Sequence, residues 1–438
     1  MTTRAKYETR PLECWRKAKE LVLEHYTEIA TAREEGKILV SGCAASCIAL
    51  PAGLGDFVYL GGEPYGATLA HDPSFSVPAM EAAEARGYAR DMCGYMRNYL
   101  GSMFLDRYYF TGGPWPRADF CFGRSFCDAG HASWYRIVSE YEGIPYFCYD
   151  EPQGFAWDGR PDQKMQYLAG QLYDGIEWME KVTGRTYDDQ KLIEALQNFF
   201  RTEALWGEIC LLNAAVPAPL DLKSMLSFMP ISMLRRHEKC AVEFMQMLRD
   251  EVKDRIADGI AAVGSERCRL ATNAPPPWSF LKMFRHLEKF GVCFVGTLVY
   301  TINSGEVKFL QDGTVVPAVP PEERGWPPMR TREDAIQTLV RWLFEHPFGF
   351  KVDWDGYLVS VARHWKVDGM ALFLNRGCPL MNTGLQDSKR ALQKAGFETT
   401  IYEGNFADCR DVDETLIMDR VEAFLEGLGV SRLPDQDQ

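Results

Sequence analysis

The sequence predicts an α/β protein with two Rossmann-like parallel-sheet domains joined by a helical subdomain. Short apolar runs of strand length alternate with amphipathic helical segments over residues 1–161 and again over residues 259–438. Residues 162–258 carry helical periodicity alone, without a strand-like run of comparable quality. A chain of 438 residues is also too long for one ordinary hydrophobic core. We therefore expect two α/β domains and a helical connector with these boundaries.

The first domain opens with a helix and a strand. Apolar residues at helical spacing over residues 11–35 predict an amphipathic helix, and residues 37–42 have the character of a short strand. Small residues at 42–47 then predict a loop that opens a further helix. Three more strands are expected in this domain, at residues 57–62, 117–124 and 144–150.

A helical segment over residues 78–104 carries the first cysteine of interest. The helical pattern breaks at Gly87 and resumes across Cys93. Arg97 then lies one helical turn further along the same face. We therefore expect Cys93 to lie within a helix.

The second α/β domain is organised around a buried strand at residues 370–374. The chain turns through residues 375–377 directly into Cys378, so a thiol sits just past the carboxyl end of this strand. In open α/β sheets the ligand binds at that end, and residues 384–396 predict the helix that returns the chain to the sheet. Other strands of this domain are expected at residues 266–272 and 291–302, and other helices at 332–346 and 413–429.

Composition limits the classes of function. The 61 acidic residues outnumber the 48 basic ones, and the net charge of −13 disfavours a nucleic-acid partner. The chain begins without an apolar signal segment and contains no run of eighteen apolar residues, so we expect a cytoplasmic protein that does not enter a membrane. Thirteen cysteines cannot all pair, which argues against a disulfide framework. Most of them are expected to be small buried residues.

Three cysteines stand out by position. Cys127 and Cys378 follow predicted strands, and Cys93 precedes the strand that leads to Cys127. Because these residues come from both α/β domains, a site formed by them lies between the domains. Three thiolates in such a protein suit zinc or a [4Fe–4S] cluster, and three protein ligands leave one metal position open. The chain contains no C-x-x-C pair, so spacing alone leaves zinc, a cluster and plain packing as alternatives.

Three stretches carry a family resemblance: GYARDMCGYMRNYLGS around Cys93, RSFCDAGHASWY around Cys127, and the block from Asn375 to Glu426. They resemble the benzoyl-CoA reductase and 2-hydroxyacyl-CoA dehydratase family, and the resemblance spans essentially the whole chain. Within that family, LPAGLGDFVYLGGEPYGATLAHD and ARDMCGYMRNYLGS are most similar to the O (B-type) subunit of bzd-type, ATP-dependent benzoyl-CoA reductases. The resemblance implies that Cys93, Cys127 and Cys378 hold a [4Fe–4S] cluster.

The resemblance also implies an activity and partners. It implies an iron–sulfur subunit that passes low-potential electrons to the ring of an aromatic acyl-CoA such as benzoyl-CoA, giving a cyclic dienoyl-CoA in anaerobic aromatic degradation. The chain has neither G-x-x-x-x-G-K-[ST] nor G-x-G-x-x-G, so ATP hydrolysis is expected on separate activator subunits with their own iron–sulfur cluster, beside a homologous second cluster-bearing subunit. The alternatives are a 2-hydroxyacyl-CoA dehydratase subunit acting through a ketyl radical, a non-catalytic scaffold subunit and a zinc-thiolate enzyme.

Two further residues are candidate catalytic groups. His131, four residues past Cys127, is a candidate proton donor, with a helix-face histidine bonded to backbone or water as the alternative. Ser46 and its neighbouring amides are candidates for holding the thioester carbonyl, with an N-cap as the alternative. Cys43 and Cys47 are expected to pack rather than bind metal.

Charged and aromatic residues surround the three cysteines in sequence. Arg97, Arg124 and Arg376 flank them and are candidates for tuning cluster charge or holding CoA phosphates, with pairing to a nearby acid as the alternative. Aromatic side chains near the same motifs suit a dry pocket for a flat acyl group or a plain core: Tyr95, Trp115 and Trp134.

Overall fold

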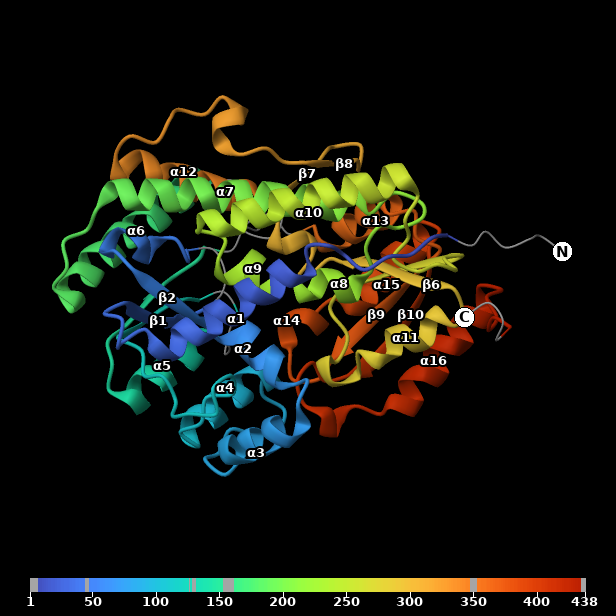
Figure 1. The fold of residues 1–438 in the computed structure, drawn as a ribbon, viewed down its shortest axis with the longest axis horizontal. Coiled ribbons are helices and arrows are strands. Elements are labelled where there is room, and N and C mark those ends of the chain that lie inside the picture. Colours follow the sequence, from blue (N-terminus) through green and yellow to red (C-terminus); the bar gives the residue numbers. More distant parts are fainter. Residues whose placement is uncertain are drawn as a thin grey trace.

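Two four-stranded sheets, each made only of parallel pairs, form the two ends of the molecule along its longest axis (Figure 1). The structure is a computed structural model that describes residues 7–43, 47–125, 127, 131–152, 161–346 and 353–434. This arrangement confirms the predicted α/β class with parallel-sheet domains.

The two sheets have the same strand order. The first sheet runs β2-β1-β3-β4 and the second β10-β9-β5-β6. In each sheet two outer strands flank a central pair, β1 and β3 in the first sheet and β9 and β5 in the second, and the strand order reverses between the two members of that pair. The strands are β1 (Ile38–Gly42), β2 (Phe57–Gly61), β3 (Phe120–Arg124), β4 (Tyr146–Tyr149), β5 (Cys268–Thr272), β6 (Val292–Thr297), β9 (Gly369–Asn375) and β10 (Glu398–Gly404).

Several strands are buried along their whole length because both faces of each sheet are covered. Every residue of β1, β3, β5 and β6 is buried. In β9 one residue, Leu374, is only partly buried. Such continuous apolar runs are typical of strands in parallel sheets with helices on both sides. This pattern made these strands visible in the sequence.

The helices of the first part are α1 (Trp15–Thr31), α2 (Gly62–Leu69), α3 (Pro73–Glu84), α4 (Gly94–Phe104) and α5 (His131–Glu142). Helices α1, α2 and α5 contact the first sheet, whereas α4 packs on α2 and α3 packs on α4. The expectation that Cys93 lies within a helix is wrong. The loop after α3 includes Gly87 at a φ of 91°, and Cys93 is the extended N-cap residue of α4 with a ψ of 122°. Arg97 does lie one turn on, since its backbone N–H donates to the Cys93 carbonyl at 3.0 Å.

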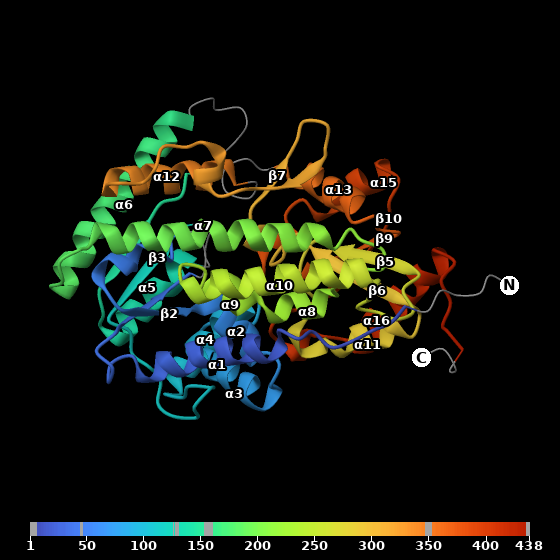
Figure 2. The ribbon, with the colours of Figure 1, turned by 45° about the horizontal axis from the view of Figure 1, so that its top comes forward.

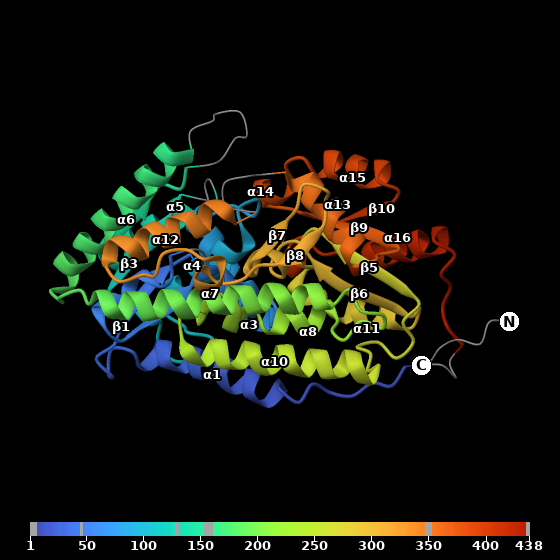
Figure 3. The same cartoon turned by 90° about the horizontal axis from the view of Figure 1, so that it is seen from above.

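Long helices run between the two sheets. The helical region contains α6 (Pro161–Thr183), α7 (Asp189–Leu212), α8 (Leu222–Ser227), α9 (Met229–Leu234) and α10 (Lys239–Asp258). In Figures 2 and 3, α7 and α10 lie side by side and extend from the first sheet to the second. Helix α12 (Arg332–Glu345), although it comes from the last third of the chain, packs against α6 and α7.

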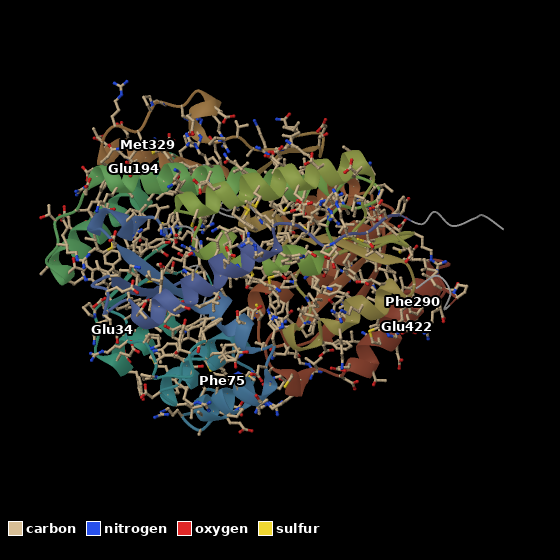
Figure 4. The ribbon with its side chains drawn as sticks, viewed as in Figure 1. Glu34, Phe75, Glu194, Phe290, Met329 and Glu422 are labelled. Carbon is tan, nitrogen blue, oxygen red and sulfur yellow. The ribbon has the colours of Figure 1, made fainter. Side chains whose placement is uncertain are left out.

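The remaining elements surround the second sheet. Its helices are α11 (Lys282–Glu288), α13 (Trp354–His364), α14 (Pro379–Asn382), α15 (Leu385–Lys394) and α16 (Glu414–Gly427). His286 and Glu422 join α11 to α16 at 2.6 Å, and Figure 4 labels Glu422 beside Phe290. An antiparallel hairpin of β7 (Val307–Phe309) and β8 (Val315–Pro317) was not expected from the sequence. Short 3-10 helices occur at Leu50–Leu54, Trp278–Phe280, Ile302–Ser304, Pro321–Arg324 and Cys409–Asp411.

One hydrophobic core connects both sheets. The largest cluster of buried apolar side chains includes Leu60 and Cys121 from the first sheet together with Leu270 and Phe373 from the second. The two sheets are therefore held against a common interior. Among the described helices, none has the length and apolar character needed to cross a membrane.

Candidate functional site

Cys127 and Cys378 lie at the same distance from the strands that precede them. Cys127 is the third residue after β3, and Cys378 is the third residue after β9. Each of these strands is central in its own sheet, with a neighbour on both sides. Ligands of open α/β folds bind outside the carboxyl ends of the strands, where the strand order reverses. Both thiols therefore lie where each sheet is best suited to bind a ligand.

Cys93 is brought to Cys378 by a close approach of two backbones. Gly377 has a φ of 79°, and a Cβ atom there would lie 2.9 Å from the Met92 carbonyl oxygen and 3.1 Å from that of Asp91. Only glycine combines this left-handed conformation with such contact. The residue before Cys378 thus touches the residue before Cys93.

The Cys127 thiol responds to burial and to the other two candidate cysteines. Burial raises the pKa of the Cys127 thiol, and charge on Cys93 and Cys378 raises it further. All three cysteines are partly buried. In the part of the chain that the structure describes, no three His, Cys, Asp or Glu side chains are arranged to hold a metal ion. A common site formed by the three cysteines remains a prediction.

Asparagine side chains hold the Cys378 loop in shape. The Asn382 amide accepts from the backbone N–H of Asn375 at 3.0 Å and donates to its carbonyl at 2.8 Å. The Asn375 side chain in turn accepts from the Phe406 N–H at 2.8 Å. Burial raises the pKa of the Cys378 thiol, and hydrogen bonds from nearby N–H groups partly offset this. The hydrogen bonds of Asn382 and Asn375 thus hold the Cys378 loop to the end of β9 and to the segment after β10.

An aromatic group that sequence reasoning missed borders the cysteines. Trp278 Nε1 donates to the Tyr95 hydroxyl at 2.6 Å, and the Tyr95 ring stacks on Phe406 with centroids 5.6 Å apart. Tyr300 also hydrogen bonds to Tyr95 and lies near enough to Cys93 to feel its charge. Tyr300 follows β6 and has a φ of 69°, a conformation that costs energy in a residue with a side chain. The sequence pattern places Tyr300 inside a strand predicted at residues 291–302, whereas β6 ends at Thr297, so no sequence signal marked this residue.

Glu63 is a second residue that was missed. It lies in the first turn of α2, directly after β2, and its carboxylate accepts from Cys43 Sγ at 3.1 Å. Its charge contributes to the raised pKa of Cys127 and of Tyr300, behind burial in both cases. Cys43 and Cys47 are buried, as packing residues would be.

The three candidate arginines all have acidic partners. Arg97 is buried and pairs with Glu84 and Asp408. Arg124 is buried and pairs with Glu151 at 2.6 Å, whereas exposed Arg376 pairs with Glu403 at 2.5 Å. A shallow recess beside Arg124 leaves no room even for a water-sized molecule, so it is not a ligand pocket. It is lined by Cys43, Cys47, Tyr59, Phe122, Gly123, Arg124 and Tyr149.

The remaining sequence candidates fall at the limits of the described residues. Ser46 lies outside them. His131 begins α5, and the position of its side chain lies outside the described part.

Of the aromatic candidates, Trp115 and Trp134 lie in the core around Tyr99, with ring centroids at 4.8 and 5.3 Å from it. Among these three aromatic candidates, Tyr95 alone borders the cysteines.

Comparison with known proteins identifies the family. The model of "2-hydroxyglutaryl-CoA dehydratase, D-component" matches residues 66–428. The alpha subunit of (R)-2-hydroxyisocaproyl-CoA dehydratase from Clostridioides difficile is 24% identical over 93% of this chain and 94% of its own length. The alpha subunit of (R)-phenyllactyl-CoA dehydratase from Clostridium sporogenes is 23% identical over 79% of both chains.

A relative from a reductase matches over a smaller share of the chain. One of the benzoyl-CoA reductase polypeptides of Thauera aromatica is 24% identical over 46% of this chain and 49% of its own length. The dehydratase polypeptides are thus similar over more of the sequence than the reductase polypeptide is. Since the family model covers most of the chain, the protein belongs to the 2-hydroxyglutaryl-CoA dehydratase D-component family.

Proposed function

We propose that the chain is a cluster-bearing subunit of a 2-hydroxyacyl-CoA dehydratase, in which Cys93, Cys127 and Cys378 hold a [4Fe–4S] cluster. One observation carries the proposal: Cys127 and Cys378 lie just past the carboxyl ends of central strands in the two sheets, and Gly377, next to Cys378, lies against the Met92 carbonyl, next to Cys93. The dehydratase alpha subunits, which resemble this chain along most of its length, support a lyase over a dearomatising reductase.

The donor set fits such a cluster. Cysteine thiolates are the usual ligands of a [4Fe–4S] cluster, and each binds a different iron atom. The sulfur ligands consequently stand further apart than around one zinc ion. When bound, the cluster supplies electrons at a potential that reaches about −700 mV in proteins.

The chain's own residues would handle protons and water. Elimination of water from a 2-hydroxyacyl-CoA removes a proton from the acyl chain, and Glu63 supplies a carboxylate near Cys127 to accept it. The Tyr300 hydroxyl, near both Cys93 and Glu63, can donate a hydrogen bond to the departing oxygen. The aromatic group formed by Tyr95, Trp278 and Phe406 excludes water from this side.

The proposal includes partners. We infer a homologous second subunit and a separate ATP-hydrolysing activator that carries its own iron–sulfur cluster. Two observations support this: the relatives are named as alpha subunits, and the chain lacks a phosphate-binding glycine motif.

A second candidate function is reduction of an aromatic acyl-CoA such as benzoyl-CoA. It is supported by the match to the benzoyl-CoA reductase polypeptide and by the aromatic side chains beside the cysteines. Flat rings stack favourably on such side chains. Both functions place the same demands on the three cysteines.

An assay of the assembled complex separates the two functions. The chain would be purified anaerobically with its partner and activator subunits and supplied with ATP and either (R)-2-hydroxyisocaproyl-CoA or benzoyl-CoA. We expect an enoyl-CoA to form from the hydroxyacyl substrate, with the aromatic absorbance of benzoyl-CoA unchanged. Loss of that absorbance would instead establish the second candidate. Failure with both substrates and with (R)-phenyllactyl-CoA would contradict the proposed substrate class.

A further inference from the structure

We propose that Arg97 is a positioning residue that fixes the segment carrying Cys93 against the second sheet. Its guanidinium is completely buried, and Nη1 lies 2.8 Å from Glu84 Oε1 and 2.9 Å from Asp408 Oδ2. Its Nε donates to the Met92 carbonyl at 3.3 Å. One side chain thus holds two carboxylates and the backbone next to Cys93. The inference rests on the proposed function only in treating Cys93 as a ligand.

A second arginine, Arg410, completes this partly buried network. Arg410 Nη2 lies 2.7 Å from Asp408 Oδ2 and 2.5 Å from Glu84 Oε1, so each carboxylate contacts both arginines. Two positive charges therefore face two negative ones. Charges removed from water are stable only when they are paired and hydrogen-bonded, and loss of one partner leaves the others uncompensated.

The network joins segments that are far apart in the sequence. Glu84 ends α3 and Arg97 lies on α4, both in the first part of the chain, whereas Asp408 follows β10 of the second sheet. The side chain of Asn405 shapes the same loop by accepting from the N–H groups of Ala407 and Asp408 at 3.1 Å. The ion pairs consequently fasten the start of α4 to the second sheet.

Backbone contacts show how closely the parts fit. A Cβ atom at Gly94, the first residue of α4, would lie 2.9 Å from Asn405 Oδ1. On the other side, Gly377 touches the Met92 carbonyl, the same group that Arg97 holds. Arg97 therefore sets the position of Cys93 relative to Cys378 through the carbonyl between them.

The guanidinium shape is essential to this role. Arginine presents several N–H donors in a fixed plane, so it reaches the carboxylates through Nη1 and the carbonyl through Nε at once. Lysine keeps the positive charge but has a single nitrogen. Arg97→Lys should retain the ion pairing and the fold while losing the contact with Met92.

The chain offers a matched control for this test. Arg90 pairs with Asp411 at 2.5 Å and links the same two segments, but its side chain is 49% exposed. Arg97→Lys and Arg97→Met would be compared with Arg90→Lys and Arg90→Met. In the metal-free full chain, the rate at which N-ethylmaleimide labels Cys93 would be measured by peptide mass spectrometry, relative to Cys240. Iron and sulfide per chain would be measured after anaerobic reconstitution.

We expect Cys93 to be labelled about tenfold faster in both Arg97 variants. Without the contact between Arg97 and Met92, the segment that carries Cys93 opens more readily and exposes the thiol to the reagent. Reconstituted iron should fall by at least half in these variants and stay unchanged in the Arg90 variants. If Arg97→Met fails to fold, Arg97→Lys alone decides. Labelling and iron equal to the Arg90 controls would overturn the role of Arg97. A wild-type chain that takes up no iron, yet still shows the labelling difference, would contradict the cluster and support the positioning role.

Discussion

At the scale of single residues, burial controls how acidic groups ionise around the first sheet. Glu142 ends α5, and its Oε1 accepts from Trp115 Nε1 at 2.8 Å. Burial raises the pKa of this carboxyl from its ordinary 4.5 to about 7, and the Trp115 hydrogen bond offsets only part of the shift. Glu142 is therefore protonated in the folded chain over a range where it is ionised in the unfolded chain.

This difference predicts a pH-dependent effect of Glu142→Gln. Because the pKa of Glu142 is raised in the folded chain, its protonated carboxyl contributes fully to the stability of the fold below pH 4.5. This contribution is lost as the pH rises to about 7. Glutamine keeps an acceptor for Trp115 without ionising. The variant should therefore gain melting temperature relative to the wild type between these pH values and keep that gain above them. Glu140→Gln, at an exposed position of the same helix, is the control. A difference in melting temperature between Glu142→Gln and the wild type that is the same at every pH would contradict the raised pKa of Glu142.

Tyr300 illustrates what single residues add to the site. Its φ of 69° is a conformation that side chains rarely adopt, and the sequence offers no glycine there. Strain of this kind persists only where the surroundings impose it, and here they include Tyr95 and Glu63. No local pattern in the sequence could predict such a conformation.

At the scale of elements, the position of α4 depends on close packing against α3. A Cβ atom at Gly101 would collide with the Ala79 carbonyl oxygen, and backbone cannot move aside cheaply. Gly170 in α6 has open space around its Cα. The two glycines therefore form a matched pair in helix interiors.

Alanine substitutions at these glycines should have opposite effects. Gly101→Ala should destabilise the protein by about 1–3 kcal/mol through overpacking and displace α4, which begins directly after Cys93. Gly170→Ala should stabilise it by roughly 0.5–1 kcal/mol, because alanine has the higher helix propensity. Denaturant melts of both variants provide the measurement. Equal shifts of the same sign would contradict the tight contact between α3 and α4.

At the scale of the whole molecule, the shared interior predicts cooperative unfolding. The largest core cluster joins the two sheets, and a second cluster joins α12 to the first sheet and to α7. Domains with boundaries near residues 161 and 258 remain a prediction, and these shared cores imply that such parts are not independent. Calorimetry should show one transition. Two resolved transitions, or a stable proteolytic fragment that ends near residue 258, would contradict a common core.

The sequence predicted those features that depend on short patterns. Continuous apolar runs identified β1, β3, β6 and β9, and the cysteines after β3 and β9 marked the carboxyl ends of both sheets. Features that depend on distant partners escaped prediction. Cys93 lies outside a helix because the Met92 carbonyl is held by Arg97 and touched by Gly377. The contacts of Glu63 with Cys43 and of Trp278 with Tyr95 likewise join residues that sequence spacing does not connect.

The most direct test of the central proposal is the iron and acid-labile sulfide content of the anaerobically purified chain and of its cysteine variants. We predict about four irons and four sulfides per chain for the wild type and for Cys240→Ser, and loss of most of both in Cys93→Ser, Cys127→Ser and Cys378→Ser. Stoichiometric zinc, or full iron content in all three variants, would contradict a [4Fe–4S] cluster held by these residues.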